Sequence, residues 1–149
     1  MVQLSLCMIV KNESANLAQC LTSVKDLVDE IVILDTGSGD RTLEIAKEFG
    51  AVTASQEWGD DFAAARNEAL KLVTGDWVLV LDGDEVFNIN AIKDLKSAIA
   101  QENTLVVNLI RHEIGATQSP YSAVSRLFRN HPAIKFARPY HETIDDSVL

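Results

Sequence analysis

Apolar residues are arranged along the chain in two alternating patterns. Short continuous runs such as LSLCMIV and EIVILD are typical of strands that are buried on both faces of a parallel sheet. Between these runs, apolar residues recur every three or four positions, as at Leu17, Leu21, Val24 and Val28, which predicts helices with one buried face. The patterns predict strands at 4–10, 30–35, 51–55, 76–82 and 104–114, and helices at 15–28, 41–50, 61–73 and 90–102.

This order of elements predicts an α/β fold. Strands that alternate with helices of about ten residues are typical of βαβ units, which place parallel strands side by side. We therefore expect a mostly parallel central sheet that is flanked by helices. From about residue 115 the alternation stops, and we expect β-structure and loops there without a clear helix.

Composition narrows the class of protein. The 149 residues are 47% hydrophobic and include only seven Gly and three Pro, which suits one globular domain. A membrane-spanning helix needs roughly 20 apolar residues, and the longest runs here, such as WVLVL, are much shorter. The net charge of −9 argues against nucleic acid as a partner, because a phosphate backbone demands a basic surface.

The N-terminus and the two cysteines bear on secretion, disulfide bonds and structural metal sites. No basic region precedes the first apolar run and no small-residue cleavage site follows it, so we interpret this run as a strand and not a signal peptide. Cys7 and Cys20 are expected to be buried free thiols, with a disulfide as the less favoured alternative. No Cys/His cluster supports a structural zinc site.

Polar residues follow three of the predicted strands, at the sheet edge where ligands bind in parallel α/β folds. These segments are Lys11-Asn12-Glu13, Asp35-Thr36-Gly37-Ser38 and Asp82-Gly83-Asp84-Glu85. In the third, two aspartates can hold a hard divalent cation, and Gly83 leaves room for a diphosphate to approach the backbone. The alternative is that Asp84 or Glu85 begins the next helix, where acidic residues are favoured.

Two further segments carry candidate chemistry, each with a plain alternative. The carboxylate of Asp35 can accept hydrogen bonds from a base or a sugar, or the segment is a capped turn before a helix. Gly37-Ser38-Gly39 matches only half of the dinucleotide pattern GxGxxG, so NAD binding is weakly supported. Arg66 can contact a phosphate or the acidic strand end, or it pairs with Glu68 or Asp61 on the helix surface.

With these residues in place, the chain resembles family 2 glycosyltransferases, which have the Rossmann-like nucleotide-sugar-binding fold called GT-A. More narrowly, it is similar to the branch that contains lipopolysaccharide-core glucosyltransferases and glycosyltransferases fused to tetratricopeptide repeats. Each matching segment is weakly specific, but five of them in this order are strongly specific. The segments are CMIVKNE, VDEIVILDTGSGDRTLEIAKEFGA, WGDDFAAARNEALKLVTGDWVLVLDGDE, RLFRN and YHETI.

The resemblance implies a metal-dependent, inverting enzyme. It would transfer a sugar from a nucleotide diphosphate sugar to a glycan, a lipid-linked or a protein acceptor. The favoured donor is a UDP-sugar, with Mg²⁺ or Mn²⁺ bridging the diphosphate. The implied process is cell-envelope polysaccharide biosynthesis, in the cytoplasm or at the inner face of the membrane. We expect residues 1–114 to bind the nucleotide sugar and residues 115–149 to begin the acceptor side of one domain. The chain is expected to be a piece of a longer protein, able to form homo-oligomers.

The resemblance also implies roles for individual residues. Asp35 would lie nearest the base, Asp84 would be the firmer metal ligand, and Asp82 would face the ribose or the metal. The implied walls of the nucleotide-sugar pocket are Val10, Asn12, Glu13, Asp35, Gly37, Arg66, Asp82 and Gly83.

The catalytic base has two candidates, Glu142 and Glu85. Glu142 is preferred because its neighbour His141 can help position the site, and His141 is also a candidate third metal ligand. The alternative is that His141 and Glu142 form an ordinary exposed loop pair.

Two other functions stay open at this point. A nucleotidyltransferase that makes nucleotide sugars predicts a Gly-rich basic loop after the first strand, but VKNESAN contains no Gly. A non-catalytic nucleotide-binding or interaction module is the third hypothesis.

Overall fold

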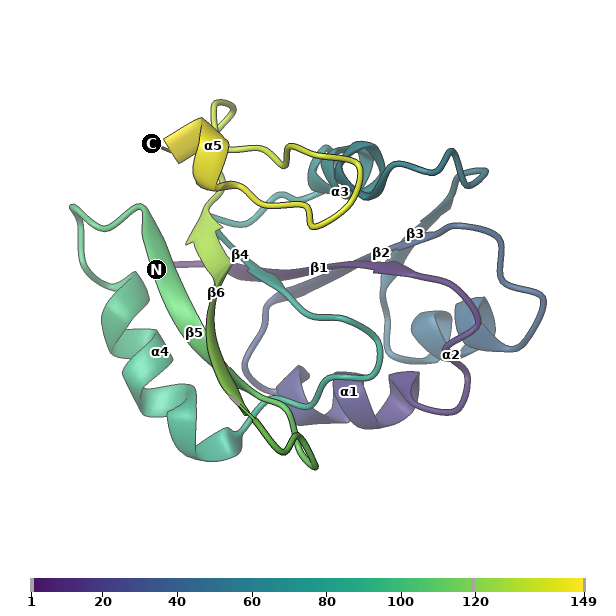
Figure 1. Ribbon diagram of the computed structural model, residues 1–149, viewed down its shortest axis with the longest axis horizontal. Coiled ribbons are helices and arrows are strands. Elements are labelled where there is room, and N and C mark those ends of the chain that lie inside the picture. Colours follow the sequence, from purple (N-terminus) through teal and green to yellow (C-terminus); the bar gives the residue numbers. More distant parts are fainter. Residues whose placement is uncertain (1, 119, 149) are drawn as a thin grey trace.

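A six-stranded sheet lies between two layers of helices and loops in the computed structural model, which describes residues 2–118 and 120–148 (Figure 1). The strands are β1 (Leu4–Val10), β2 (Glu30–Asp35), β3 (Val52–Ser55), β4 (Trp77–Val80), β5 (Val106–His112) and β6 (Tyr121–Arg129). The helices are α1 (Leu17–Val24), α2 (Thr42–Glu48), α3 (Phe62–Leu70), α4 (Ile92–Ile99) and α5 (Asp145–Val148), with a 3-10 turn at Ile89–Ala91.

The sheet has the order β3-β2-β1-β4-β6-β5. The first four strands in this order are parallel, whereas β6 is antiparallel to both β4 and β5. The predicted mostly parallel sheet is therefore confirmed. Residues 115–148 contribute β6 to the interior of the sheet, so both expected parts of the domain share one sheet.

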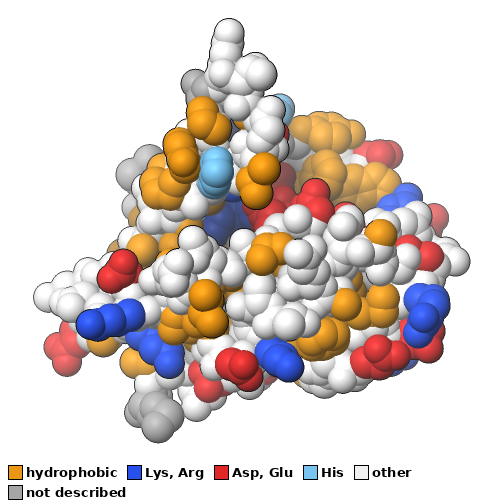
Figure 2. All heavy atoms as spheres, turned by 90° about the horizontal axis from the view of Figure 1, so that it is seen from below, with side chains coloured by type: hydrophobic (Ala, Val, Ile, Leu, Met, Phe, Trp, Pro, Cys, Tyr) orange, Lys and Arg blue, Asp and Glu red, His pale blue; other side chains and the backbone are white. Residues whose placement is uncertain are grey.

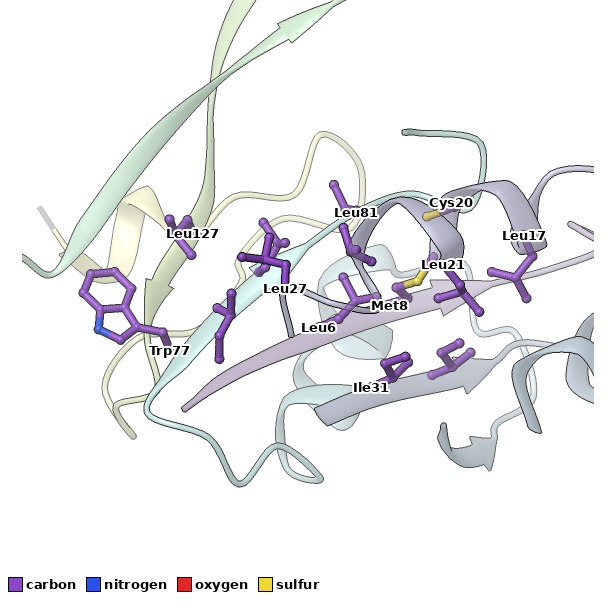
Figure 3. Close-up of a cluster of buried hydrophobic side chains, with 14 of the residues drawn as sticks. Leu6, Met8, Leu17, Cys20, Leu21, Leu27, Ile31, Trp77, Leu81 and Leu127 are labelled. Carbon is purple, nitrogen blue, oxygen red and sulfur yellow. The ribbon is translucent and has the colours of Figure 1, made fainter. Parts of the chain in front are cut away.

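Alternate residues of the strands enter two separate cores. On one face, strand residues such as Leu6, Met8 and Leu79 pack against α1, α2 and α4. Figure 3 shows part of this core, where Leu17 and Leu21 of α1 lie over the sheet. On the other face, alternate strand residues pack against α3 and against apolar side chains of residues 134–144. This period of two fixes which strand-end residues point toward α3.

The predicted elements are present, but the helices are shorter than their apolar patterns. The predicted helix at 15–28 is α1, which ends at Val24. Residues 145–148 form the short helix α5 in a region where no helix was expected. Cys7 and Cys20 are buried and free as predicted, and burial raises the pKa of each thiol to about 12. Within the described residues, every helix is too short or too polar to cross a bilayer.

Candidate active site

A cleft of about 840 Å³ opens at the carboxyl ends of β1, β2 and β4. Its other walls come from the beginning of α3, from the β5–β6 hairpin and from residues 136–145. In the face drawn in Figure 2, acidic and basic side chains adjoin each other in a hollow beside a projecting part of the surface. Eight of the predicted site residues line this cleft: Val10, Glu13, Arg66, Asp82, Gly83, Asp84, His141 and Glu142.

The loops after β1 and β2 are tied to each other behind the cleft wall. Asn12, at a φ of 53°, accepts a hydrogen bond through Oδ1 from the Gly39 N–H at 2.8 Å. Its own N–H donates to the Ser38 hydroxyl at 2.9 Å. The Glu13 N–H donates to the Thr42 hydroxyl at 2.9 Å, which joins the same two loops. Asn12 therefore holds the edge of the cleft without lining it.

Asp35 is buried and belongs to its own turn. Its carboxylate accepts hydrogen bonds from the Gly37 and Ser38 N–H groups at 3.1 and 3.0 Å, and from the Ser38 hydroxyl. Asp35 and Gly37 are absent from the residues that line the cleft, whereas Thr36 between them is present. The geometry thus matches the capped turn that the sequence left open, and contact of Asp35 with a base stays a prediction.

Asp82 lies between two arginines from different parts of the chain. Because Leu81 packs on the α1 side of the sheet, the next residue points toward α3. Arg66 of α3 contacts Asp82 Oδ1 at 2.7 Å, and Arg126 of β6 contacts Oδ2 at 3.4 Å. Burial alone would raise the pKa of Asp82. The charges and hydrogen bonds of Arg126 and Arg66 together lower it by more than burial raises it, so the pKa of Asp82 lies below its ordinary value.

Arg66 connects this strand end to the segment that carries Glu142. Its side chain is only 4% exposed, and its Nε contacts Glu142 Oε1 at 3.3 Å. Arg66 therefore pairs with the acidic strand end and with Glu142, and not with Glu68 or Asp61, the surface alternative.

Asn67, the neighbour of Arg66, fixes the segment that brings Glu142 into the cleft. Its side-chain amide donates to the Phe136 carbonyl at 2.9 Å and accepts from the Phe136 N–H at 2.8 Å. Ala137 and Thr143 then pair across the loop, with an N–H to carbonyl bond in each direction. His141 lies inside this loop at a φ of 53° and is exposed. The pair His141-Glu142 is thus held by a closed loop.

The Glu85 side chain binds within its own loop and is not among the residues that line the cleft. Its Oε1 accepts from the Asp82 N–H at 2.7 Å and contacts Arg126 Nη1 at 2.9 Å. The following turn begins at Ile89 with Asn88 as its cap, so Glu85 does not start a helix. Glu85 instead shapes the acidic loop Asp82-Gly83-Asp84-Glu85.

The close approach of the Glu13 side chain favours a glycine at position 83. A β-carbon placed on Gly83 would lie 2.8 Å from Cγ of Glu13, which is closer than real contacts of this kind. The Glu13 side chain therefore lies on the side of Gly83 where a β-carbon would point, and Gly83 itself lines the cleft.

The acidic strand end fits a divalent cation that is shared with a substrate. Asp84 is exposed on the cleft wall, and its carboxylate has no hydrogen bond or ion pair within the described residues. Among residues 2–118 and 120–148, no group of three or more His, Cys, Asp and Glu side chains is placed to hold a metal ion. Asp82, Asp84 and His141 thus do not form a closed cage. Mg²⁺ usually takes one or two carboxylates plus substrate phosphates, and this donor set suits that mode.

The sequence patterns did not single out Arg126 or Asn67 for their roles. Both lie in segments that carried the family resemblance, RLFRN and WGDDFAAARNEAL, but no spacing connects Arg126 to Asp82, 44 residues earlier. No local sequence pattern could have found Arg126, because its contact with Asp82 depends on where β6 pairs in the sheet.

Residues 5–148 match the profile of glycosyl transferase family 2, which is nearly the whole chain. The chain belongs to this family. Among curated relatives, a TPR repeat-containing protein of Synechococcus elongatus is 54% identical over 149 residues, which are 100% of this chain and 37% of the relative. The glycosyltransferase SunS of Bacillus subtilis is 34% identical over 146 residues, which cover 90% of this chain and 33% of SunS. This chain thus spans about a third of the length of these relatives.

Solved structures show the same fold. S. aureus TarS superposes with a TM-score of 0.71 at 22% identity, over 91% of this chain and 30% of TarS. TarS 1–349 in complex with UDP-GlcNAc gives a TM-score of 0.62 at 19% identity, over 91% and 48% of the two chains. Mycobacterium tuberculosis glucosyl-3-phosphoglycerate synthase in complex with Mn²⁺ and UDP-glucose gives 0.58 at 23% identity, over 70% and 42%. The expected GT-A fold is therefore confirmed for this family 2 domain.

Proposed function

We propose that this domain transfers a sugar from a UDP-sugar to an acceptor hydroxyl, with inversion at the anomeric carbon. The observation that carries the proposal is the Asp82 strand end, where carboxylates and two arginines meet in one cleft. A nucleotide diphosphate needs positive partners for its oxygens and acidic ligands for a bridging cation, and both are present here. Two structures with the same fold were solved with UDP-GlcNAc and with UDP-glucose, which supports the donor class.

In this proposal Asp84 and Asp82 hold a divalent cation together with the diphosphate. When bound, Mg²⁺ or Mn²⁺ supplies charge stabilisation for the departing diphosphate. Arg66 supports the same charge from the α3 side and keeps Asp82 in place, since its contact with Asp82 Oδ1 is 2.7 Å. The synthase structure with Mn²⁺ and UDP-glucose supports the choice of cation.

Glu142 is the proposed general base. It accepts the proton of the acceptor hydroxyl while the hydroxyl oxygen bonds to the anomeric carbon and the diphosphate leaves from the opposite face. Its carboxylate lines the cleft and is oriented by the Arg66 Nε at 3.3 Å. Glu85 is the less favoured base, because its Oε1 already binds the Asp82 N–H and Arg126.

The position of the cleft walls supports a proposal for the acceptor side. Besides the beginning of α3, the β5–β6 hairpin and residues 136–145 form the walls that are not made by the strand-end loops. We propose that a glycan, a lipid-linked or a protein acceptor enters between them, with residues 1–114 supplying most of the donor side.

A calorimetric titration with UDP, with and without Mn²⁺, tests the proposal. Wild-type protein is expected to bind UDP more tightly with Mn²⁺, and Asp84→Ala is expected to lose the part of the affinity that depends on Mn²⁺. Asp76→Ala is the matched control, because Asp76 lies at the opposite end of β4 and accepts a hydrogen bond from the Gln3 N–H. Absence of UDP binding to the wild type would contradict the proposed donor class, and an unchanged Mn²⁺ effect in Asp84→Ala would contradict the proposed ligand.

A further inference from the structure

The two arginines beside Asp82 oppose the binding of a cation there. Each of its two carboxylate oxygens contacts an arginine, Oδ1 at 2.7 Å and Oδ2 at 3.4 Å. A cation at Asp82 would have to approach these positive charges closely, and at such distances like charges repel strongly even at a protein surface. Movement of one guanidinium away from Asp82 therefore favours a metal site that includes this carboxylate.

The two arginines differ in their freedom to move. Arg66 is 4% exposed, is also bound to Glu142 and lies with its Cζ 5.9 Å from the centre of the Phe136 ring. Arg126 is 17% exposed and extends from β6 into the cleft, and among the described residues its ion pairs are with Asp82 and Glu85. Moving Arg66 would leave a buried charge without a partner, which is costly. Of the two, Arg126 is therefore the arginine that turns at the lower cost.

The acidic loop keeps its shape without Arg126. The Glu85 Oε1 accepts from the Asp82 N–H at 2.7 Å, and the Glu85 N–H donates to the Asp82 carbonyl at 3.0 Å. Arg66 still holds Asp82 Oδ1. Departure of Arg126 thus removes positive charge from the loop and exposes Asp82 Oδ2, and these contacts do not depend on it.

We propose that Arg126 masks Asp82 in the nucleotide-free protein and transfers its guanidinium to the diphosphate when the donor binds, which frees Asp82 for the divalent cation. The inference rests on the proposed function, since it assumes a diphosphate in the same cleft. A diphosphate offers a guanidinium several charged oxygens, and paired N–H to phosphate bonds are among the strongest hydrogen bonds in proteins. The cleft is then prepared for a cation only when the donor is present, because a ligand shifts such an equilibrium by its preference for one state.

Arg126→Gln separates the two roles of this residue. Without nucleotide, Mn²⁺ is expected to bind the variant about tenfold more tightly than the wild type, because a nearby positive charge is gone. Free Mn²⁺ is measured by electron paramagnetic resonance. Without metal, UDP is expected to bind about tenfold more weakly, while uridine, which has no phosphate, binds equally to both proteins.

Two further variants control for charge and for folding. Arg41→Gln removes the same charge at an exposed residue of the loop before α2, where Arg41 pairs with Glu44, and both affinities are expected to stay within about twofold of wild type. Arg126→Lys keeps the charge and is expected to keep Mn²⁺ binding near the wild-type level. Thermal unfolding of each variant shows whether the fold is retained.

The outcomes distinguish this inference from the proposed function. An unchanged or weaker Mn²⁺ affinity in folded Arg126→Gln overturns the masking, whatever UDP does. A wild type that does not bind UDP overturns the proposed function and the transfer of Arg126 to a diphosphate together. An equal loss of UDP and uridine affinity overturns the phosphate contact alone.

Discussion

Arg66 is the residue on which the geometry of the cleft depends most directly. Its buried guanidinium joins Asp82 at the end of β4 to Glu142 in the closed loop, two residues that are 60 positions apart in the chain. One of its nitrogens, Nη1, has no hydrogen-bond partner among the described residues. Buried charges of this kind are tolerated when they are paired, and loss of one partner is costly. Arg66 therefore couples the proposed metal ligand to the proposed base.

Glu142→Gln tests the base at the scale of one residue. Glutamine keeps an oxygen for the Arg66 Nε but cannot accept a proton, so kcat for UDP-sugar hydrolysis or transfer is expected to fall by about 10²-fold or more. The affinity for UDP, measured by calorimetry, is expected to change by less than about twofold.

Two glutamates give the comparison for this prediction. Glu68→Gln changes an exposed residue of α3 that pairs with Lys71, and its kcat is expected to equal the wild-type value. A large loss of kcat in Glu85→Gln together with a normal kcat in Glu142→Gln would reverse the assignment of the base.

At the scale of elements, the Asn67 side chain docks residues 136–143 on α3 through the backbone of Phe136. The Asn67 amide forms two hydrogen bonds to the backbone of Phe136, at 2.9 and 2.8 Å. The Phe62 N–H adds a third contact, to the Pro139 carbonyl at 2.8 Å. The Arg-Asn pair of α3 therefore has two tasks, in which Arg66 binds the carboxylates and Asn67 docks the loop that carries one of them.

Asn67→Ala is expected to lower the free energy of unfolding by about 1–3 kcal/mol, because it leaves the Phe136 N–H and carbonyl without their partners. Urea denaturation measures this loss, and limited proteolysis is expected to cut near residues 137–142 sooner than in the wild type. Asn103→Ala is the control, since Asn103 is exposed. Equal protease resistance of Asn67→Ala and wild type would show that the loop is held by other contacts.

Elements with long local patterns were predictable, and contacts between distant segments were not. Both β1 and β2 were predicted with the same bounds that the structure gives, because fully buried strands produce continuous apolar runs. The position of β6 between β4 and β5 has no local signal, since antiparallel pairing depends on which partner is available. The same holds for Arg126 and Asn67, whose partners lie far away in the sequence. The polar strand ends that meet at one cleft were predictable from topology alone.

At the scale of the whole molecule, the chain has a net charge of −9, and part of this charge joins elements by accepting hydrogen bonds. Glu30, at the start of β2, accepts from Ser5 at 2.7 Å and from the N–H and hydroxyl of Thr74 at 2.8 and 2.7 Å. It thereby ties β1 and β2 to the turn before β4. Burial alone would raise the pKa of Glu30. The hydrogen bonds from Thr74 and Ser5 together lower it by more than burial raises it, so the pKa of Glu30 lies below its ordinary value.

Stability is therefore expected to fall in acid. A carboxyl whose pKa is lower in the folded than in the unfolded state stabilises the fold above its unfolded pKa, about 4 for Asp and Glu, and this contribution is lost as the pH falls through the folded pKa. Glu30 and Asp82 both belong to this class. The urea midpoint is expected to decrease from about pH 6 to about pH 3, and to decrease less in Glu30→Gln. Glu57→Gln, at an exposed residue, is expected to follow the wild-type curve, and an identical curve for Glu30→Gln would contradict this role of Glu30.

The place of β6 in the sheet sets an order of events during translation. Residues 4–80 contain four strands that pair with one another, so this part of the sheet can assemble as it leaves the ribosome. In contrast, β5 emerges before β6, which is its partner in the described sheet. Until β6 emerges, neither edge of β5 is paired. At roughly 5–20 residues per second this interval lasts on the order of a second. The nascent chain thus carries its acidic loop before Arg126 is made, and an open strand edge is a hazard for pairing between neighbouring chains on one messenger RNA.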